Sequence, residues 1–124
     1  MRDHKSLVAW QVAHQVARGV LSVSRLRWRP DAAALFGQLQ RSSLSVQLNI
    51  AEGYALGRDR QLCYHLRLAY GSAVETGDLL ELAESEKLIP DGEAQALLAD
   101  CQRTQRPLLG LLRRYSRPTG PPRP

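Results

Sequence analysis

Hydrophobic residues recur every three or four positions along most of the chain, the spacing that places them on one face of an α-helix. Four stretches have this spacing, at about residues 5–26, 32–55, 60–88 and 92–115. The third is the most regular, with alternating steps of four and three residues through Leu62, Leu66, Ala69, Ala73, Thr76, Leu80 and Ala83. No stretch alternates with the period of two that a half-buried strand requires. The pattern therefore predicts an all-α protein.

Short breaks separate the predicted helices. The residue before Pro30 is disfavoured in a helix, so the first helix ends there and Asp31 is expected to cap the second. Gly57 is expected to end the second helix and Asp59 to cap the third. Asp91 is the predicted cap of the fourth. Four amphipathic helices joined in this way predict an antiparallel, up-down-up-down four-helix bundle.

The predicted domain covers residues 1–115. Pro107 lies inside the last helix, where it removes one backbone hydrogen bond and should kink or locally break the helix. Residues 116–124 contain four prolines and are predicted to form a disordered or polyproline-like tail.

The predicted core follows the apolar stripe of each helix. Besides the third-helix positions above, it consists of Ala9, Val12, Val16, Val23 and Leu26, then Phe36, Leu39, Ser43, Val46, Ile50 and Gly53, and finally Ala94, Leu97, Cys101, Thr104, Leu108, Leu111 and Tyr115.

The second predicted helix carries a further apolar row on a different side, formed by Leu44, Leu48, Ala51 and Ala55. A helix that is apolar on two sides is either surrounded within its own fold or buried against another subunit. We favour the second interpretation, which predicts an oligomer with this row at its interface.

Charge divides the chain into three blocks. Residues 1–67 carry ten basic and four acidic residues, residues 68–100 one basic and eight acidic, and residues 101–124 six basic and none acidic. The net charge of +5 therefore hides blocks of +6, −7 and +6. Basic surfaces attract polyanions, whereas the acidic block equally suits a basic partner, including another copy of this chain.

Arginine supplies fifteen of the seventeen cations, and its planar guanidinium suits phosphate. The predicted nucleic-acid contacts lie beside the turn between the second and third helices and at the end of the fourth, with one in the second helix: Arg41, Arg58, Arg60, Arg67, Arg113, Arg114 and Arg117. Tyr54 and Tyr64 lie near the turn and either stack on bases or pack at the edge of the core. The alternative for the arginines is a solvated surface without a ligand.

The residues that most often carry chemistry have no catalytic or metal-binding spacing. His4, His14 and His65 form no metal-ligand pattern, and no phosphate-binding loop or nucleophile motif occurs. Cys63 and Cys101 are expected to be free core residues, too few for a disulfide framework. No apolar run is long enough to span a membrane. We therefore expect a cytoplasmic protein without catalytic residues, cofactor or metal.

Three segments resemble the proteins encoded by intervening sequences of bacterial 23S ribosomal RNA genes (the S23 family). Gln38–Tyr54 reads QLQRSSLSVQLNIAEGY and is similar to the family pattern Q-L-R-R-A-x-x-S-I-P-x-N-I-A-E-G. Leu7–His14 is similar to the family's start, L-x-V-W-Q-x-A-H, and Gly71–Glu75 to its G-S-x-x-E segment. Gln47 stands where the family usually has proline.

The resemblance implies a four-helix bundle that assembles as a ring-like homopentamer, without enzymatic activity or cofactor. Some relatives bind nucleic acid and a reverse transcriptase, which makes both possible partners of this chain. The matching positions are Trp10, Arg41, Asn49, Glu52, Gly53, Gly71, Ser72 and Glu75. The resemblance favours buried structural roles for these positions, with Gly53 and Gly71 allowing close helix contact.

Two functions fit these observations. The first is a non-enzymatic, oligomeric accessory protein that binds nucleic acid. The second is a self-assembling scaffold that binds a protein partner and no nucleic acid.

Overall fold

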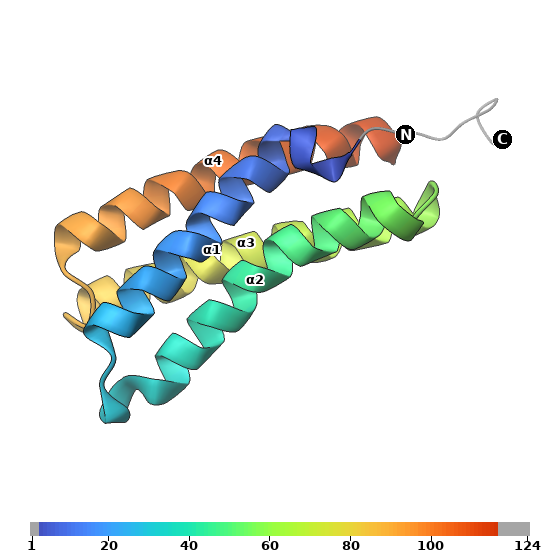
Figure 1. The fold of residues 1–124 in the computed structure, drawn as a ribbon. Helices are drawn as coiled ribbons and strands as arrows, with labels where there is room; N and C mark the ends of the chain where they lie inside the picture. The colour runs from blue at the N-terminus through green and yellow to red at the C-terminus, as the bar shows by residue number, and fades with distance from the viewer. Residues whose placement is uncertain (1–2, 117–124) are drawn as a thin grey trace, which may run out of the picture.

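The computed structural model describes residues 3–116, which form four α-helices and two short 3-10 turns. The helices are α1 (Val8–Arg27), α2 (Ala33–Leu56), α3 (Arg60–Ser85) and α4 (Asp91–Tyr115), and the turns are η1 (His4–Ser6) and η2 (Pro30–Ala32). Figure 1 shows that successive helices reverse direction along one bundle. The predicted all-α, antiparallel four-helix bundle is confirmed. The predicted tail lies outside the described residues, apart from Ser116.

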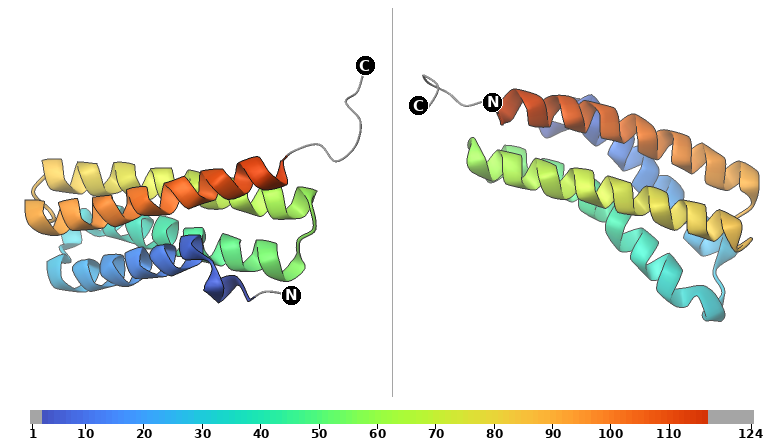
Figure 2. Two further views of the ribbon diagram at one scale, coloured as in Figure 1. Left: turned by 90° about the horizontal axis from the view of Figure 1, so that it is seen from above. Right: turned by 180° about the vertical axis from the view of Figure 1, so that it is seen from behind.

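Each helix packs against two others: α2 lies between α1 and α3, and α4 lies between α3 and α1. The start of α1, the α2–α3 turn and the end of α4 lie together at one end of the bundle, which we call the terminal end (Figures 1 and 2). The α1–α2 and α3–α4 connections lie at the other end, the distal end. Sequence segments far apart are therefore neighbours in space at both ends.

The core consists of two apolar clusters, one in each half of the bundle. Phe36, Leu39, Leu80 and Ile89 are fully buried in the distal cluster, and Ile50, Leu66 and Leu108 in the terminal one. Small and weakly polar side chains pack between the two clusters, namely Ser43, Thr76, Cys101 and Thr104, beside Ala13 and Ala73 of the terminal cluster.

All seven predicted core positions of α3 are buried, as are the six of α2. Leu111 and Tyr115 are half-buried against the terminal cluster. The prediction for Leu26 is wrong, because this side chain is 70% exposed. α1 ends one residue later, and the Trp28 ring lies 6.2 Å from that of Phe36 at this edge of the core.

The predicted capping roles of two aspartates are wrong. Asp31 lies within η2, and its carboxylate accepts two hydrogen bonds from the Arg29 guanidinium, at 2.7 and 3.0 Å. Asp91 is the first residue of α4 rather than its cap. Asp59 does precede α3 as predicted, but its side chain makes no capping hydrogen bond.

Two helices also differ from the predicted ones. α3 ends at Ser85, three residues before the predicted end, and Lys87 has a positive φ of 59° that turns the chain toward α4. α4 runs unbroken through Pro107, so the predicted local break is wrong. Thr104 and Leu108 are buried on either side of this proline, and their packing holds the helix together despite the missing backbone donor.

Candidate nucleic-acid interface

Two arginine pairs that are far apart in the sequence lie at the terminal end. Arg58 and Arg60 flank the start of α3, while Arg113 and Arg114 lie in the last turn of α4. The end of α2, just before the turn, touches the end of α4 through Tyr54 and Tyr115, whose rings lie edge to face with centroids 6.3 Å apart. The fold therefore joins the basic blocks that the sequence separates by the acidic one.

These arginines are available to a ligand. Arg58, Arg60, Arg67, Arg113 and Arg114 are all exposed, and within residues 3–116 none of them lies in a salt bridge. The Arg114 guanidinium lies 5.5 Å from the centre of the Tyr115 ring. We call these five residues the terminal arginines.

Two further predicted contacts do not belong to this group. Arg41 lies more than three turns before the end of α2, and its guanidinium donates two hydrogen bonds to Gln38 Oε1. Gln38 in turn donates to the Glu75 carboxylate of α3. Arg117 lies outside the described residues.

Two arginines at the distal end are bound to carboxylates. Arg27 donates to both carboxylate oxygens of Glu93, at 2.8 and 3.1 Å, and joins α1 to α4. These hydrogen bonds lower the pKa of Glu93. Arg29 is bound to Asp31 within the α1–α2 connection. Glu93 of α4 and Asp31 of η2 therefore neutralise these two arginines, whereas the terminal arginines have no such partners in the described chain.

The two tyrosines near the turn have different surroundings. Tyr54 is half-buried against the terminal cluster, and burial raises the pKa of its hydroxyl group. Tyr54 is thus an edge-of-core residue. Tyr64 is 56% exposed and lies on α3 between Arg60 and Arg67.

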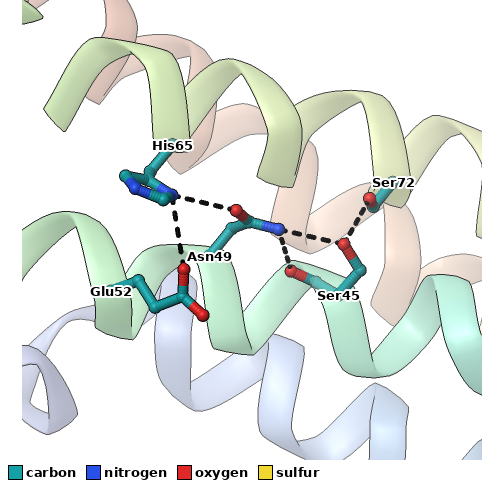
Figure 3. A network of polar contacts seen from close by, with 5 residues as sticks. All are labelled: Ser45, Asn49, Glu52, His65 and Ser72. Atoms are coloured by element: carbon teal, nitrogen blue, oxygen red, sulfur yellow. Dashed lines mark hydrogen bonds and ion pairs between the residues drawn. The ribbon is translucent and has the colours of Figure 1, made fainter. Parts of the chain in front are cut away.

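Three of the family-like motif residues, Asn49, Glu52 and Ser72, take part in a row of polar contacts between α2 and α3, which Figure 3 shows. Asn49 Nδ2 donates to the carbonyl and the hydroxyl of Ser45, at 2.9 and 3.0 Å. Ser72 Oγ donates to Ser45 Oγ at 2.8 Å, and Asn49 Oδ1 lies 3.1 Å from His65 Nδ1. The same ring nitrogen lies 3.7 Å from the Glu52 carboxylate. We call Ser45, Asn49, Glu52, His65 and Ser72 the polar seam.

The hydrophobic pattern did not indicate that His65 is a side-chain partner of Asn49. The signal was the α2–α3 turn at Gly57–Asp59, because residues at equal distances before and after the turn of an antiparallel helical hairpin face each other. Asn49 and His65 are equidistant from Gly57. Such a count places His65 within about one helical turn of the position that faces Asn49.

The structural roles predicted for the motif positions are correct for some and wrong for others. Gly53 is buried, and a Cβ atom there would lie 3.0 Å from His65 Cβ and 3.1 Å from Leu62 Cδ1, so close helix contact is confirmed. Gly71 is exposed, and a Cβ atom would meet nothing within 4 Å. Arg41, Glu52 and Glu75 are exposed as well, because they flank the α2–α3 contact rather than fill it.

Trp10, the motif residue of α1, is half-buried against the terminal cluster and stacks on His14, with ring centroids 4.9 Å apart. His14 Nδ1 lies 3.0 Å from Gln47 Oε1 of α2. A side-chain contact between α1 and α2 thus occupies the position where the family pattern has proline.

Residues 3–116 leave the second apolar row of α2 only partly covered. Leu48 is 51% exposed, Ala55 is exposed, and Leu44 and Ala51 are half-buried. The row is therefore not surrounded within its own fold.

The cysteines are free and buried. The Cys101 thiol donates to the carbonyl of Ala73 at 3.0 Å, and burial raises its pKa to about 11, which keeps it protonated at neutral pH. Residues 3–116 contain no group of three metal-ligating side chains. In the same part of the chain, no helix has the length and apolar character needed to cross a membrane.

Fold and charge together define a small all-α bundle with a polar seam between α2 and α3 and a cluster of arginines at one end. The chain belongs to the family described as 23S rRNA-intervening sequence protein, whose model matches residues 5–110. The resemblance seen in the sequence is thereby confirmed.

The fold is similar to that of a solved structure. It is a protein with unknown function from the S23 ribosomal protein family of Bacteroides thetaiotaomicron VPI-5482, at 21% sequence identity and a TM-score of 0.77. The match covers 86% of this chain and 96% of that one. The comparison with curated proteins gives no match.

Proposed function

We propose that the protein is a non-enzymatic accessory protein that binds nucleic acid through the terminal arginines. The observation that carries this proposal is the position of five arginines toward one end of the bundle, exposed and without carboxylate partners in the described chain: Arg58, Arg60, Arg67, Arg113 and Arg114. Guanidinium groups in such a setting bind phosphate without the cost of breaking existing ion pairs.

Oligomerisation multiplies these contacts. The uncovered row of Leu44, Leu48, Ala51 and Ala55 is the proposed interface, and the resemblance favours a ring of five subunits. Two phosphate contacts from each of five subunits would neutralise about ten phosphates, so affinity should fall by about a thousandfold or more between about 50 and 200 mM salt. Contacts to phosphate carry no sequence information, and binding should tolerate any sequence.

The test measures fluorescence anisotropy with mixed-sequence RNA and DNA at low salt. The double substitution of Arg58→Ala and Arg60→Ala should weaken binding to all sequences alike. Removing the same charge from two paired distal residues, with Arg27→Ala and Arg29→Ala, is the matched control and should have little effect. Absence of binding to both nucleic acids, or equal losses in the two variants, would contradict the proposal.

The exposed row on α2 also favours a second function, a self-assembling scaffold that binds a protein partner and no nucleic acid. In that case the acidic surface of α3 and α4 provides the charge complement for a basic partner. A nucleic-acid-processing protein such as a reverse transcriptase is compatible with either function. A gene for such a protein beside this one would favour the first function over the second.

A further inference from the structure

We propose that the ligand of the terminal end is single-stranded nucleic acid and that Tyr64 stacks on one of its bases. This inference rests on the proposed function and assigns its substrate class. The face of α3 that turns away from the core carries residues at steps of four, three and four positions, namely Arg60, Tyr64, Arg67 and Gly71. Residues at this spacing lie one above the other on a helix.

Exposure separates Tyr64 from the other three tyrosines of the chain. Tyr54, Tyr70 and Tyr115 are half-buried against the terminal cluster, whereas 56% of Tyr64 is open to solvent. A large aromatic side chain held outside the core between two cations offers a flat apolar face beside two phosphate-binding groups.

The surroundings of the ring leave room for a base. Gly71, the next residue on this face beyond Arg67, has open space where a side chain would stand, and Leu68 beside it is 40% exposed. On its other side the Tyr64 ring lies edge to face with the His65 ring, with centroids 5.5 Å apart. His65 is itself held by Asn49 of the polar seam. The ring that contacts Tyr64 is therefore fixed by the α2–α3 contact.

The spacing of Arg60 and Arg67 fits single-stranded nucleic acid with one base on Tyr64. Arg60 and Arg67 are seven residues apart, about 10 Å along the helix, so they can contact phosphates on either side of a base that lies on Tyr64. Within residues 3–116 neither arginine has a salt-bridge partner. Bases of a single strand have free faces for stacking, whereas those of a duplex are already stacked on one another.

The experiment compares binding of a single-stranded oligonucleotide and the duplex of the same sequence at one salt concentration. Wild-type protein should prefer the single strand. Tyr64→Ala should weaken single-strand binding between about fivefold and a hundredfold, the usual contribution of one stacked base. The affinity for the duplex and the salt dependence should stay as in the wild type, and Tyr64→Phe, which keeps the ring, should bind the single strand normally.

Leu82→Ala is the matched control, since Leu82 is 48% exposed on the same face of α3 but lies toward the acidic distal end. An oligonucleotide with a fluorescent base analogue gives a second readout: wild type and Tyr64→Phe should quench it by stacking, and Tyr64→Ala should not. Circular dichroism checks that every variant is folded.

Equal affinity for strand and duplex, or an unchanged affinity of Tyr64→Ala, would overturn the stacking role of Tyr64 and leave phosphate binding by the terminal arginines intact. Binding to neither form would overturn the proposed function and this inference together.

Discussion

The terminal and distal ends of the bundle both carry arginines, but their charges are in different states. At the distal end Arg27 and Arg29 are bound to Glu93 and Asp31, so their guanidinium groups already have partners. At the terminal end the arginines face solvent, and none has a carboxylate partner within residues 3–116. The first and third sequence blocks have the same net charge. Within residues 3–116, Arg18, Arg25 and Arg106 are also exposed and outside the salt bridges, but the terminal end carries five such arginines. The number of charges thus says less about binding than the partners that the fold gives them.

The largest expected effect comes from disrupting the proposed subunit interface, because the oligomer brings the terminal ends of several subunits together. Leu48→Glu places a charge in the proposed interface, where an unpaired buried charge costs several kcal/mol, and should dissociate the oligomer. Because fewer terminal arginines then act together, nucleic-acid affinity and its salt dependence should both fall. Analytical ultracentrifugation of the variant and the wild type measures the first effect.

The control for that experiment is Leu82→Glu. Leu82 is exposed to nearly the same degree as Leu48 but lies on α3, outside the row. It should leave the oligomer intact. A wild-type protein that sediments as a monomer at micromolar concentration would contradict the proposed interface.

A smaller effect, on the free energy of unfolding, is expected from alanine substitutions at two glycines. Gly53 lies in the close α2–α3 contact near the terminal end, and Gly71 lies on the open face of α3. Gly53→Ala adds a methyl group within about 3 Å of His65 and Leu62, and the overpacking, commonly about 1–3 kcal/mol, should exceed the gain in helix propensity of about 1 kcal/mol. Gly71→Ala meets no atom and should raise the free energy of unfolding by up to about 1 kcal/mol. Urea unfolding at a fixed protein concentration measures both. Equal stability of the two variants would show that α2 and α3 are not closely packed at Gly53.

The smallest expected effect is on the pH dependence of thermal stability, through the Arg27–Glu93 pair of the distal end. Hydrogen bonds from Arg27 lower the pKa of Glu93 in the folded state, so this carboxylate stabilises the fold above the unfolded value of about 4.3 and loses that contribution as the pH falls through its folded pKa. Glu93→Gln should therefore reduce the loss of thermal stability between neutral and acidic pH. Glu81→Gln, which removes an exposed carboxylate outside the ion pairs of residues 3–116, should not. If both variants respond to pH as the wild type does, the pair contributes nothing measurable.

The repeat of hydrophobic residues was enough to predict the bundle and most of its core, because burial imposes the same spacing on every turn of a helix. It failed at Leu26, where the spacing continues into the last turn of α1 although the core no longer extends that far. It also failed for the caps, since Asp31 lies within η2 and Asp91 is already the first residue of α4, so neither stands at the position just before its helix.

Side-chain partners were harder to predict than helices. The contact between Asn49 and His65 depends on the register of the α2–α3 hairpin, and the pairing of Arg27 with Glu93 depends on the packing of α1 against α4. Neither is a property of one helix. The same reason left the choice between Tyr54 and Tyr64 open until the fold placed one ring against Tyr115 and the other in solvent.

The most direct test of the difference between the ends is the salt dependence of nucleic-acid binding. The logarithm of the binding constant should fall linearly with the logarithm of salt concentration, with a slope set by the number of phosphates neutralised. The double variant with Arg113→Ala and Arg114→Ala should have a shallower slope than the wild type, whereas the distal variant with Arg27→Ala and Arg29→Ala should keep the wild-type slope. Equal slopes for all three proteins, or a shallower slope for the distal variant alone, would contradict the conclusion that the terminal arginines bind phosphate.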